Sequence, residues 1–253
     1  PPPPPPPPRA RCRGAPAPPP PRAPRRGGAT GPGPPAARIA YVLSDGAGLP
    51  RALSDLGAAL RDRDLLDATV TYGHAFGGDY EAVSVFSALV VARHVAEADV
   101  AVVAMGPGIV GTNTRLGFSG LEVGPILDAT TALGGVPIAC LRVSFADPRP
   151  RHLGVSHHSL TALRLATRSR VVVPVPCVGG AAEARIRADL AEAGIADRHD
   201  LVDVAPPDAL GLLAAADLSV VSMGRPAADD PVLFQAAAGS VAAARLPPPG
   251  ARP

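Results

Sequence analysis

Histidines and acids gather in two short segments whose side chains could carry out acid–base chemistry. The first segment is GHAFGGD (73–79) and the second runs from Ser144 to His158. Imidazole titrates close to neutral pH, so a histidine beside a carboxylate can pass protons to and from a substrate. We expect the catalytic groups in these segments and at the acid that follows the first apolar run: Asp45, His74, Asp79, His157 and His158.

A divalent metal site is an alternative use of the same side chains. His74 and Asp79 could act together with the histidines of the second segment, since imidazole and carboxylate both bind such ions. The spacing matches neither H-E-x-x-H nor paired cysteines, so the sequence leaves the metal open, with helix capping or packing as a third role. Because His157 and His158 are adjacent at a predicted helix start, they should point to different faces, and we expect only one of them to serve a given site.

A glycine-rich segment, GPGIVG (106–111), directly follows an apolar run. Glycines let the backbone approach a phosphate, and successive N–H groups form a concavity that attracts anions. A dinucleotide site also needs a helix opening inside the motif and an acid about 20 residues on, and neither is present. The segment therefore predicts an anion site or a tight turn. The expected ligand contacts are Gly106, Gly108, Gly111, Thr112, Thr114, Arg115, Asp147, His152 and Arg225.

Arg115 is the cation closest to this segment along the chain. It lies four residues past Gly111 and has no acidic neighbour in sequence. A guanidinium fork adds bidentate geometry that a backbone concavity lacks. We expect Arg115 to face the pocket.

The elements that must position these residues follow a regular alternation. Nearly continuous apolar runs, typical of strands covered on both faces, are predicted as strands at 38–43, 68–73, 99–105, 137–143, 170–175, 200–204 and 218–222. Helices are predicted at 49–63, 81–97, 120–133, 157–167, 181–194, 207–216 and 230–243. Strand followed by helix throughout predicts a doubly wound α/β fold with a mainly parallel sheet and helices on both faces.

Ligands of such sheets bind beyond the carboxyl ends of the strands. Asp45, His74, Gly108 and Asp147 each follow a predicted strand within a few residues. We expect them at one edge of the sheet. The connectors at the opposite edge carry ordinary turn residues.

The first 35 residues differ in composition from the rest. They hold 17 of the 33 Pro and six Arg but no acid. Almost nothing there is apolar enough to offset the entropy of ordering, so we expect a disordered Pro/Arg-rich tail over 1–35. A single α/β domain is expected over 36–245 and a disordered end over 246–253. The chain begins with Pro rather than Met, as a fragment or a mis-started reading frame would.

Net charge, hydropathy and cysteine content limit the classes of binding partner and the cellular location that we expect. Beyond residue 35, 18 Arg stand against 22 acids, a net charge of −4, so we expect no nucleic-acid partner. No run of about 18 apolar residues is present, so no membrane partner is expected. Three Cys without a Cys-x-x-Cys pair cannot form a disulfide framework, which favours a cytoplasmic location.

Three long blocks carry a resemblance to a known family: GHAFGGDYEAVSVFSALVVARHV, VAMGPGIVGTNTRLGFSGLEVG and RVSFADPRPRHLGVSHHSLTALRLA. With them, the chain from about Arg38 to Ala244 resembles the bacterial family of uncharacterised proteins called domain of unknown function 3866. Members of that family carry an additional N-terminal region, which the Pro/Arg tail replaces here. The resemblance implies a folded bacterial cytoplasmic domain, and it brings no catalytic residues to carry over.

Two functions remain open from the residues. One is an enzyme acting on a small anionic metabolite, held by the glycine-rich loop at the carboxyl edge of the sheet. The other is a non-catalytic ligand-binding or regulatory domain using the same edge. Catalysis requires an acid and a histidine within hydrogen-bond reach of each other and of a pocket, whereas binding tolerates dispersed contacts. The cofactor and the oligomeric state do not follow from the sequence.

Overall fold

A computed structural model describes residues 37–44, 50–106 and 108–244. Its contacts group the chain into two units, Pro1–Pro35 and Ala36–Pro253. Predictions made for Asp45, for the tail over 1–35 and for the end over 246–253 lie outside the described residues. In the described part of the chain, no helix has both the length and the apolar character needed to cross a bilayer.

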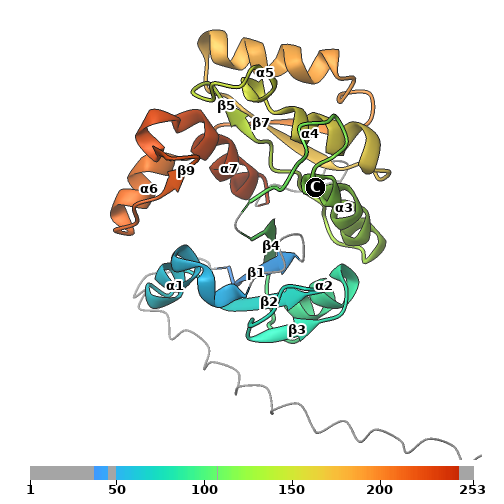
Figure 1. Cartoon of the computed structure of the whole chain (residues 1–253), viewed down its shortest axis with the longest axis vertical. Helices are drawn as coiled ribbons and strands as arrows, with labels where there is room; N and C mark the ends of the chain where they lie inside the picture. Colours follow the sequence, from blue (N-terminus) through green and yellow to red (C-terminus); the bar gives the residue numbers. More distant parts are fainter. Residues whose placement is uncertain (1–36, 45–49, 107, 245–253) are drawn as a thin grey trace, which may run out of the picture. The chain divides into compact units, whose positions relative to one another are not determined.

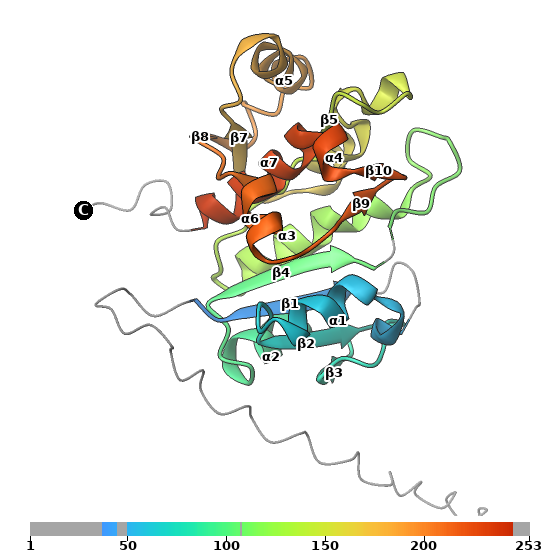
Figure 2. The ribbon, with the colours of Figure 1, turned by 90° about the vertical axis from the view of Figure 1, so that its left-hand side faces the viewer.

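Four parallel strands form the largest sheet, in the order β3-β2-β1-β4. They are β1 (Ile39–Ser44), β2 (Ala68–Tyr72), β3 (Tyr80–Ala82) and β4 (Val100–Met105), seen side by side in Figure 2. One face of the sheet packs against α2 (Val85–His94), where Ala40, Val42 and Val70 meet Ala88 and Ala92 in a buried cluster. Ser84 and Ser87 form a capping box at the start of α2.

The opposite face of this sheet carries α1 (Asp55–Asp62), which follows a short 3₁₀ turn, η2 (Arg51–Leu53). Side chains alternate along a strand, so Thr69 points away from the face of Val70. Arg61 Nη1 of α1 lies 3.4 Å from the Thr69 hydroxyl. This contact places α1 beside the Thr69 side of β2.

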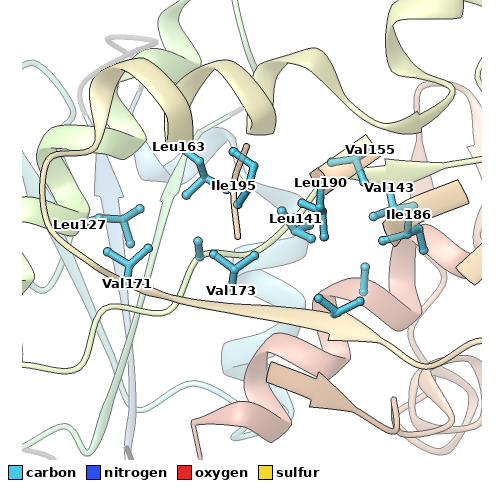
Figure 3. Close-up of a cluster of buried hydrophobic side chains, with 13 residues drawn as sticks. Leu127, Leu141, Val143, Val155, Leu163, Val171, Val173, Ile186, Leu190 and Ile195 are labelled. Atoms are coloured by element: carbon cyan, nitrogen blue, oxygen red, sulfur yellow. The ribbon is translucent and has the colours of Figure 1, made fainter. Parts of the chain in front are cut away.

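The chain after residue 118 builds a second apolar core (Figure 3). Its strands pair two by two: β7 (Val172–Pro176) with β8 (Asp200–Val204) in parallel, β5 (Val143–Ser144) with β6 (Gly154–Val155) and β9 (Val221–Ser222) with β10 (Arg225–Pro226) antiparallel. The helices and helical turns are η3 (Ser119–Glu122), α3 (Val123–Ala132), η4 (Pro150–His152), α4 (His157–Thr161), the π-helical η5 (Ala162–Ala166), α5 (Gly180–Glu192), α6 (Ala209–Ala215), η6 (Ala227–Asp229) and α7 (Pro231–Ala243) (Figure 1).

The α/β class and the parallel sheet are confirmed, but the predicted strand over 137–143 is largely wrong. Residue 138 forms a single parallel bridge to Val172, and only Val143–Ser144 is a strand, paired antiparallel to β6. Val172 N donates to Pro137 O, and Ala139 N donates to Val172 O. The next donor on that side of β7 would be Pro174, which has no N–H, so the ladder ends there.

Two further differences concern short elements. The predicted strand over 218–222 is reduced to β9, half of an antiparallel hairpin. Sequence reasoning missed β3, placing a helix start at 81 where a three-residue edge strand precedes the Ser84 cap. Both elements are shorter than the four residues over which alternation becomes a usable signal.

Candidate functional site

The segment from Asp147 to His158 folds back on itself and brings three histidines together. It leaves β5, makes the 3₁₀ turn that ends at His152, returns through β6 and enters α4 at His157. Gly154, at φ 81°, allows the return, and a Cβ there would lie 2.3 Å from Asp189 Oδ2. Ser156 caps α4 and accepts a hydrogen bond from His158 N at 3.3 Å.

The histidine cluster consists of His152, His157 and His158. The His152 ring centroid lies 5.0 Å from that of His157 and 4.8 Å from that of His158, and the latter two are 4.3 Å apart. One ring nitrogen from each residue lies within 4.8 Å of the other two. The expectation that His157 and His158 point to different faces is wrong, because both rings converge at the first turn of α4, where the chain bearing His152 approaches the helix end.

Phe118 supplies the apolar support of this cluster. It is buried, its ring stacks on His158 with centroids 4.1 Å apart, and it meets His157 edge-on at 5.6 Å. The α4–η5 segment is held from the other side by α3. A Cβ at Gly124 of α3 would lie 2.4 Å from the Ala166 carbonyl group, so a glycine is needed for this close packing.

Hydrogen bonds orient the buried His152 ring. Its Nδ1 lies 2.7 Å from Ser156 Oγ, and its Nε2 accepts from Arg151 Nε at 3.3 Å. The Ser156 hydroxyl thus fixes both the ring and the start of α4. By contrast, His157 Nε2 is buried and has no hydrogen-bond partner within the described part of the chain.

Burial is the main cause that lowers the pKa of all three rings. Burial, followed by the charges of Arg149 and Arg142, lowers the pKa of His152 to about 4. Burial and the neighbouring histidines lower the pKa of His158 to about 4, and burial with Arg151 lowers that of His157. Neutral imidazoles can accept protons or bind a metal.

The cluster opens into a cavity of about 130 Å³, which we call the histidine cavity. Arg149 and Arg151 are the charged residues among those that line it, and no acid does so in the described part of the chain. Its full lining is Ile109, Gly111, Asn113, Thr114, Gly117, Phe118, Arg149, Arg151, His152, His157 and His158.

The glycine-rich loop forms part of the cavity wall, but several of its backbone N–H groups donate hydrogen bonds within the protein. Gly108 N donates to Gly106 O, Val110 N to Ser119 Oγ and Thr112 N to Gly117 O, which leaves those three N–H groups unable to hold an anion. The Thr112 and Thr114 hydroxyls lie 3.1 Å apart, and each bonds the backbone of Gly117. A Cβ at Gly117 would lie 2.1 Å from Thr112 Oγ1, so the loop is built as a tight turn.

Asp147 is the centre of a buried ion network behind the cavity. Its side chain is 1% exposed and lies 3.0 Å from Arg142, 2.9 Å from Arg149 and 3.9 Å from Arg225. Hydrogen bonds from Arg149 hold its pKa far below the usual range of a carboxyl group. Arg225 also lies 3.6 Å from Asp230. Asp147 and Arg225, predicted to bind ligand, therefore pair within the protein, and the network positions Arg149.

The structure leaves the other predicted residues outside the histidine cavity. Asp79 is paired with Arg61 at 2.6 Å and accepts hydrogen bonds from Thr69 N and Thr69 Oγ1, which ties β2 to α1. His74 is exposed in the loop after β2, and Arg115 is exposed on the glycine-rich loop. Neither lines the cavity, and no ion pair joins Arg115 to another described residue.

Gly106 lines a second, larger cavity instead. That cavity, of about 330 Å³, lies at the carboxyl ends of β1 and β4. Most of its lining is apolar, including Tyr41, Leu43, Leu56 and Met105. The described residues place no histidine in its wall, so the histidine cavity is the better candidate for chemistry.

Sequence reasoning missed four residues that shape the histidine cavity: Phe118, Arg149, Arg151 and Ser156. The two arginines alternate with prolines in DPRPRH, just before His152, and that spacing was the available signal. Phe118 and Ser156 carried no signal. Phe118 contacts His157 and His158, which are 39 and 40 positions away, and Ser156 acts on a turn that only the fold defines.

The comparisons with known proteins agree with the resemblance of the three sequence blocks. No curated protein and no solved structure matches the chain. The family profile described as "Protein of unknown function (DUF3866)" matches residues 30–242, which is most of the chain. The chain therefore belongs to the DUF3866 family.

Proposed function

We propose that the protein is an enzyme that binds a small anionic metabolite in the histidine cavity and uses an imidazole of the cluster as its proton acceptor. One observation carries the proposal: the cavity is lined by two arginines and three histidines, with no acid among the described lining residues. Such a wall attracts an anion and offers it charged donors.

The arginines would hold the anion. Arg151 is exposed, and its Nη1 bonds the side chain of Asn113 across the cavity mouth. Arg149 is fixed from behind by Asp147. The cavity has the volume of about four water molecules, which suits an oxyanion or the carboxylate end of a metabolite.

His157 is the best placed proton acceptor. Its buried Nε2 has no hydrogen-bond partner among the described residues, so that atom can accept a proton from a bound ligand. The neighbouring His152 is already oriented by Ser156.

A non-catalytic binding domain is the second candidate, and one observation favours it. None of the hydrogen bonds made by the three rings in the described part of the chain goes to a carboxylate. The acid–histidine pair expected of an acid–base enzyme is therefore not formed by these rings.

Binding of inorganic phosphate, measured by calorimetry, tests the proposal. Arg151→Gln should weaken binding about tenfold, on the scale of a lost charge-assisted hydrogen bond. Arg115→Gln is the matched control, an exposed arginine of the glycine-rich loop outside the cavity, and should leave the affinity within about twofold. The reverse pattern would move the anion site to the glycine-rich loop and overturn the proposal.

Turnover separates the two candidates. A screen of anionic metabolites should find compounds that raise the melting temperature of the wild type but not of Arg151→Gln. Those compounds are then incubated with the wild type and with His157→Gln, and products are followed by mass spectrometry. Conversion by the wild type that His157→Gln abolishes supports an enzyme, whereas binding without conversion supports a binding domain.

A further inference from the structure

The histidine cluster has a property that anion binding does not use. Three imidazoles come from two elements, the 3₁₀ turn η4 and the helix α4, and converge with one nitrogen each within 4.8 Å of the others. Within the described part of the chain, the three rings hydrogen-bond to no carboxylate and to no other ring of the cluster. In proteins, such convergence of neutral imidazoles is the donor set of a transition metal.

We propose that His152, His157 and His158 together bind one divalent transition-metal ion of the Zn²⁺ class, with a fourth position open to the histidine cavity. A tetrahedral ion with nitrogens at about 2.1 Å holds them about 3.4 Å apart. The rings therefore need to close by about 1.4 Å, which small side-chain rotations provide.

The surroundings of each ring agree with ligation. Ser156 holds Nδ1 of His152, which leaves Nε2 as the ligand atom and supplies the outer hydrogen bond that metal-bound histidines commonly make. His157 Nε2 is buried without a partner in the described part of the chain, and an ion would satisfy it. His158 is held parallel to Phe118, which fixes the ring plane.

Arg151 is the group that must move. Its Nε donates to His152 Nε2 at 3.3 Å, on the atom that the ion would take. The side chain is exposed, so its Nε can release His152 while its guanidinium stays at the cavity, where Nη1 bonds Asn113. There it would face an anion on the open coordination position, and the cations around the cluster would favour a negatively charged fourth ligand.

The metal inference does not depend on anion binding by the arginines, and the variants separate the two. It does differ from the proposed function at one atom, because His157 Nε2 cannot accept a proton while it binds the ion. Arg151→Gln removes a donor that competes with the ion, so Zn²⁺ should bind it at least as tightly as the wild type. The same variant should bind phosphate more weakly. If Arg151→Gln binds Zn²⁺ more weakly than the wild type, the metal proposal fails. If it binds phosphate as tightly as the wild type, the anion proposal fails.

The test uses the tag-free full chain after treatment with a chelator. Calorimetry with ZnCl₂ should give one ion per chain, and Co²⁺ should give the absorption bands of a four-coordinate site. His157→Gln should weaken Zn²⁺ binding about 100-fold or more, beyond the 10- to 100-fold cost of losing an outer-shell partner. His74→Gln, which changes an exposed histidine outside the cluster, should leave it within about twofold.

X-ray absorption of the Zn²⁺-loaded wild type keeps the test valid if His157→Gln does not fold. Three imidazole nitrogens around the ion support the proposal. Absence of Zn²⁺ binding by the wild type, a coordination shell with fewer than three imidazoles, or loss of binding in His74→Gln rather than in His157→Gln overturns it.

Discussion

Two loops of this protein both carry histidine and aspartate, but only one of them places its histidines around a cavity. The loop after β2 holds His74 and Asp79, and the loop after β5 holds Asp147 and the histidine cluster. In the first loop, Asp79 ties β2 to α1 through Thr69 and Arg61, and His74 is exposed. In the second loop, Asp147 also forms ion pairs within the protein, but the three imidazoles of the histidine cluster line a cavity.

The comparison shows that a candidate site is what remains after a fold has satisfied its own polar groups. Asp79 was predicted as a catalytic acid and Asp147 as a ligand contact, and both are engaged in structural ion pairs. In the cluster, the buried His157 Nε2 is left without a hydrogen-bond partner among the described residues, and the exposed Arg151 lines the same cavity. In this protein, the aspartates after the strands are therefore weaker indicators of a functional site than the histidines that hydrogen-bond to no described carboxylate.

The first way to sharpen the comparison is Asp147→Asn, which should give the largest effect. The side chain is 1% exposed and faces three arginines, and removing one partner of a buried ion network leaves uncompensated charge. We expect the free energy of unfolding to fall by about 3 kcal/mol, measured by urea denaturation.

The pH dependence of that loss checks its origin. The folded state holds the pKa of Asp147 below its ordinary value of 3.8, with hydrogen bonds from Arg149 as the main cause. The stabilisation is therefore complete well above pH 3.8 and fades as the pH falls below it. The difference between the wild type and Asp147→Asn should narrow in acid, and a difference that stays constant down to pH 3 would contradict the ion network as its source.

Asp79→Asn should give the smaller effect of the two. Asp79 and Arg61 are 21% and 20% exposed, so water compensates part of the lost charge. We expect a loss of about 1 to 2 kcal/mol in the free energy of unfolding. Phosphate and Zn²⁺ binding should stay within about twofold of the wild type, because Asp79 lies outside the histidine cavity. A loss of either ligand would show that the two loops form one site.

The sequence was sufficient for the larger elements of the fold. Runs such as the one at Ile39–Ser44 predicted the strands of the four-stranded sheet, because buried parallel strands are continuous in apolar residues. The sequence did not predict that the described strands divide into separate sheets. Beside β7, the ladder ends after one bridge because Pro174 has no N–H to donate. That effect depends on which side of β7 the missing N–H faces, and only the paired structure defines the side.

The candidate site was predicted in part. Five of the predicted site residues line the histidine cavity: His152, His157, His158, Gly111 and Thr114. Their gathering around Phe118 depends on the return of the chain through β6, which no local pattern encodes. Arg149 and Arg151 were not predicted as ligand contacts, because Arg115 is the cation closest to the glycine-rich loop along the chain.

The most direct test of the account is the position of a bound oxyanion. Crystals of the full chain soaked in selenate would locate the anion by the anomalous signal of selenium. We predict a peak inside the histidine cavity, within hydrogen-bond distance of Arg149 or Arg151, that is absent from crystals of Arg151→Gln. A peak at the glycine-rich loop beside Arg115, or an empty histidine cavity in crystals that bind selenate elsewhere, would contradict the account.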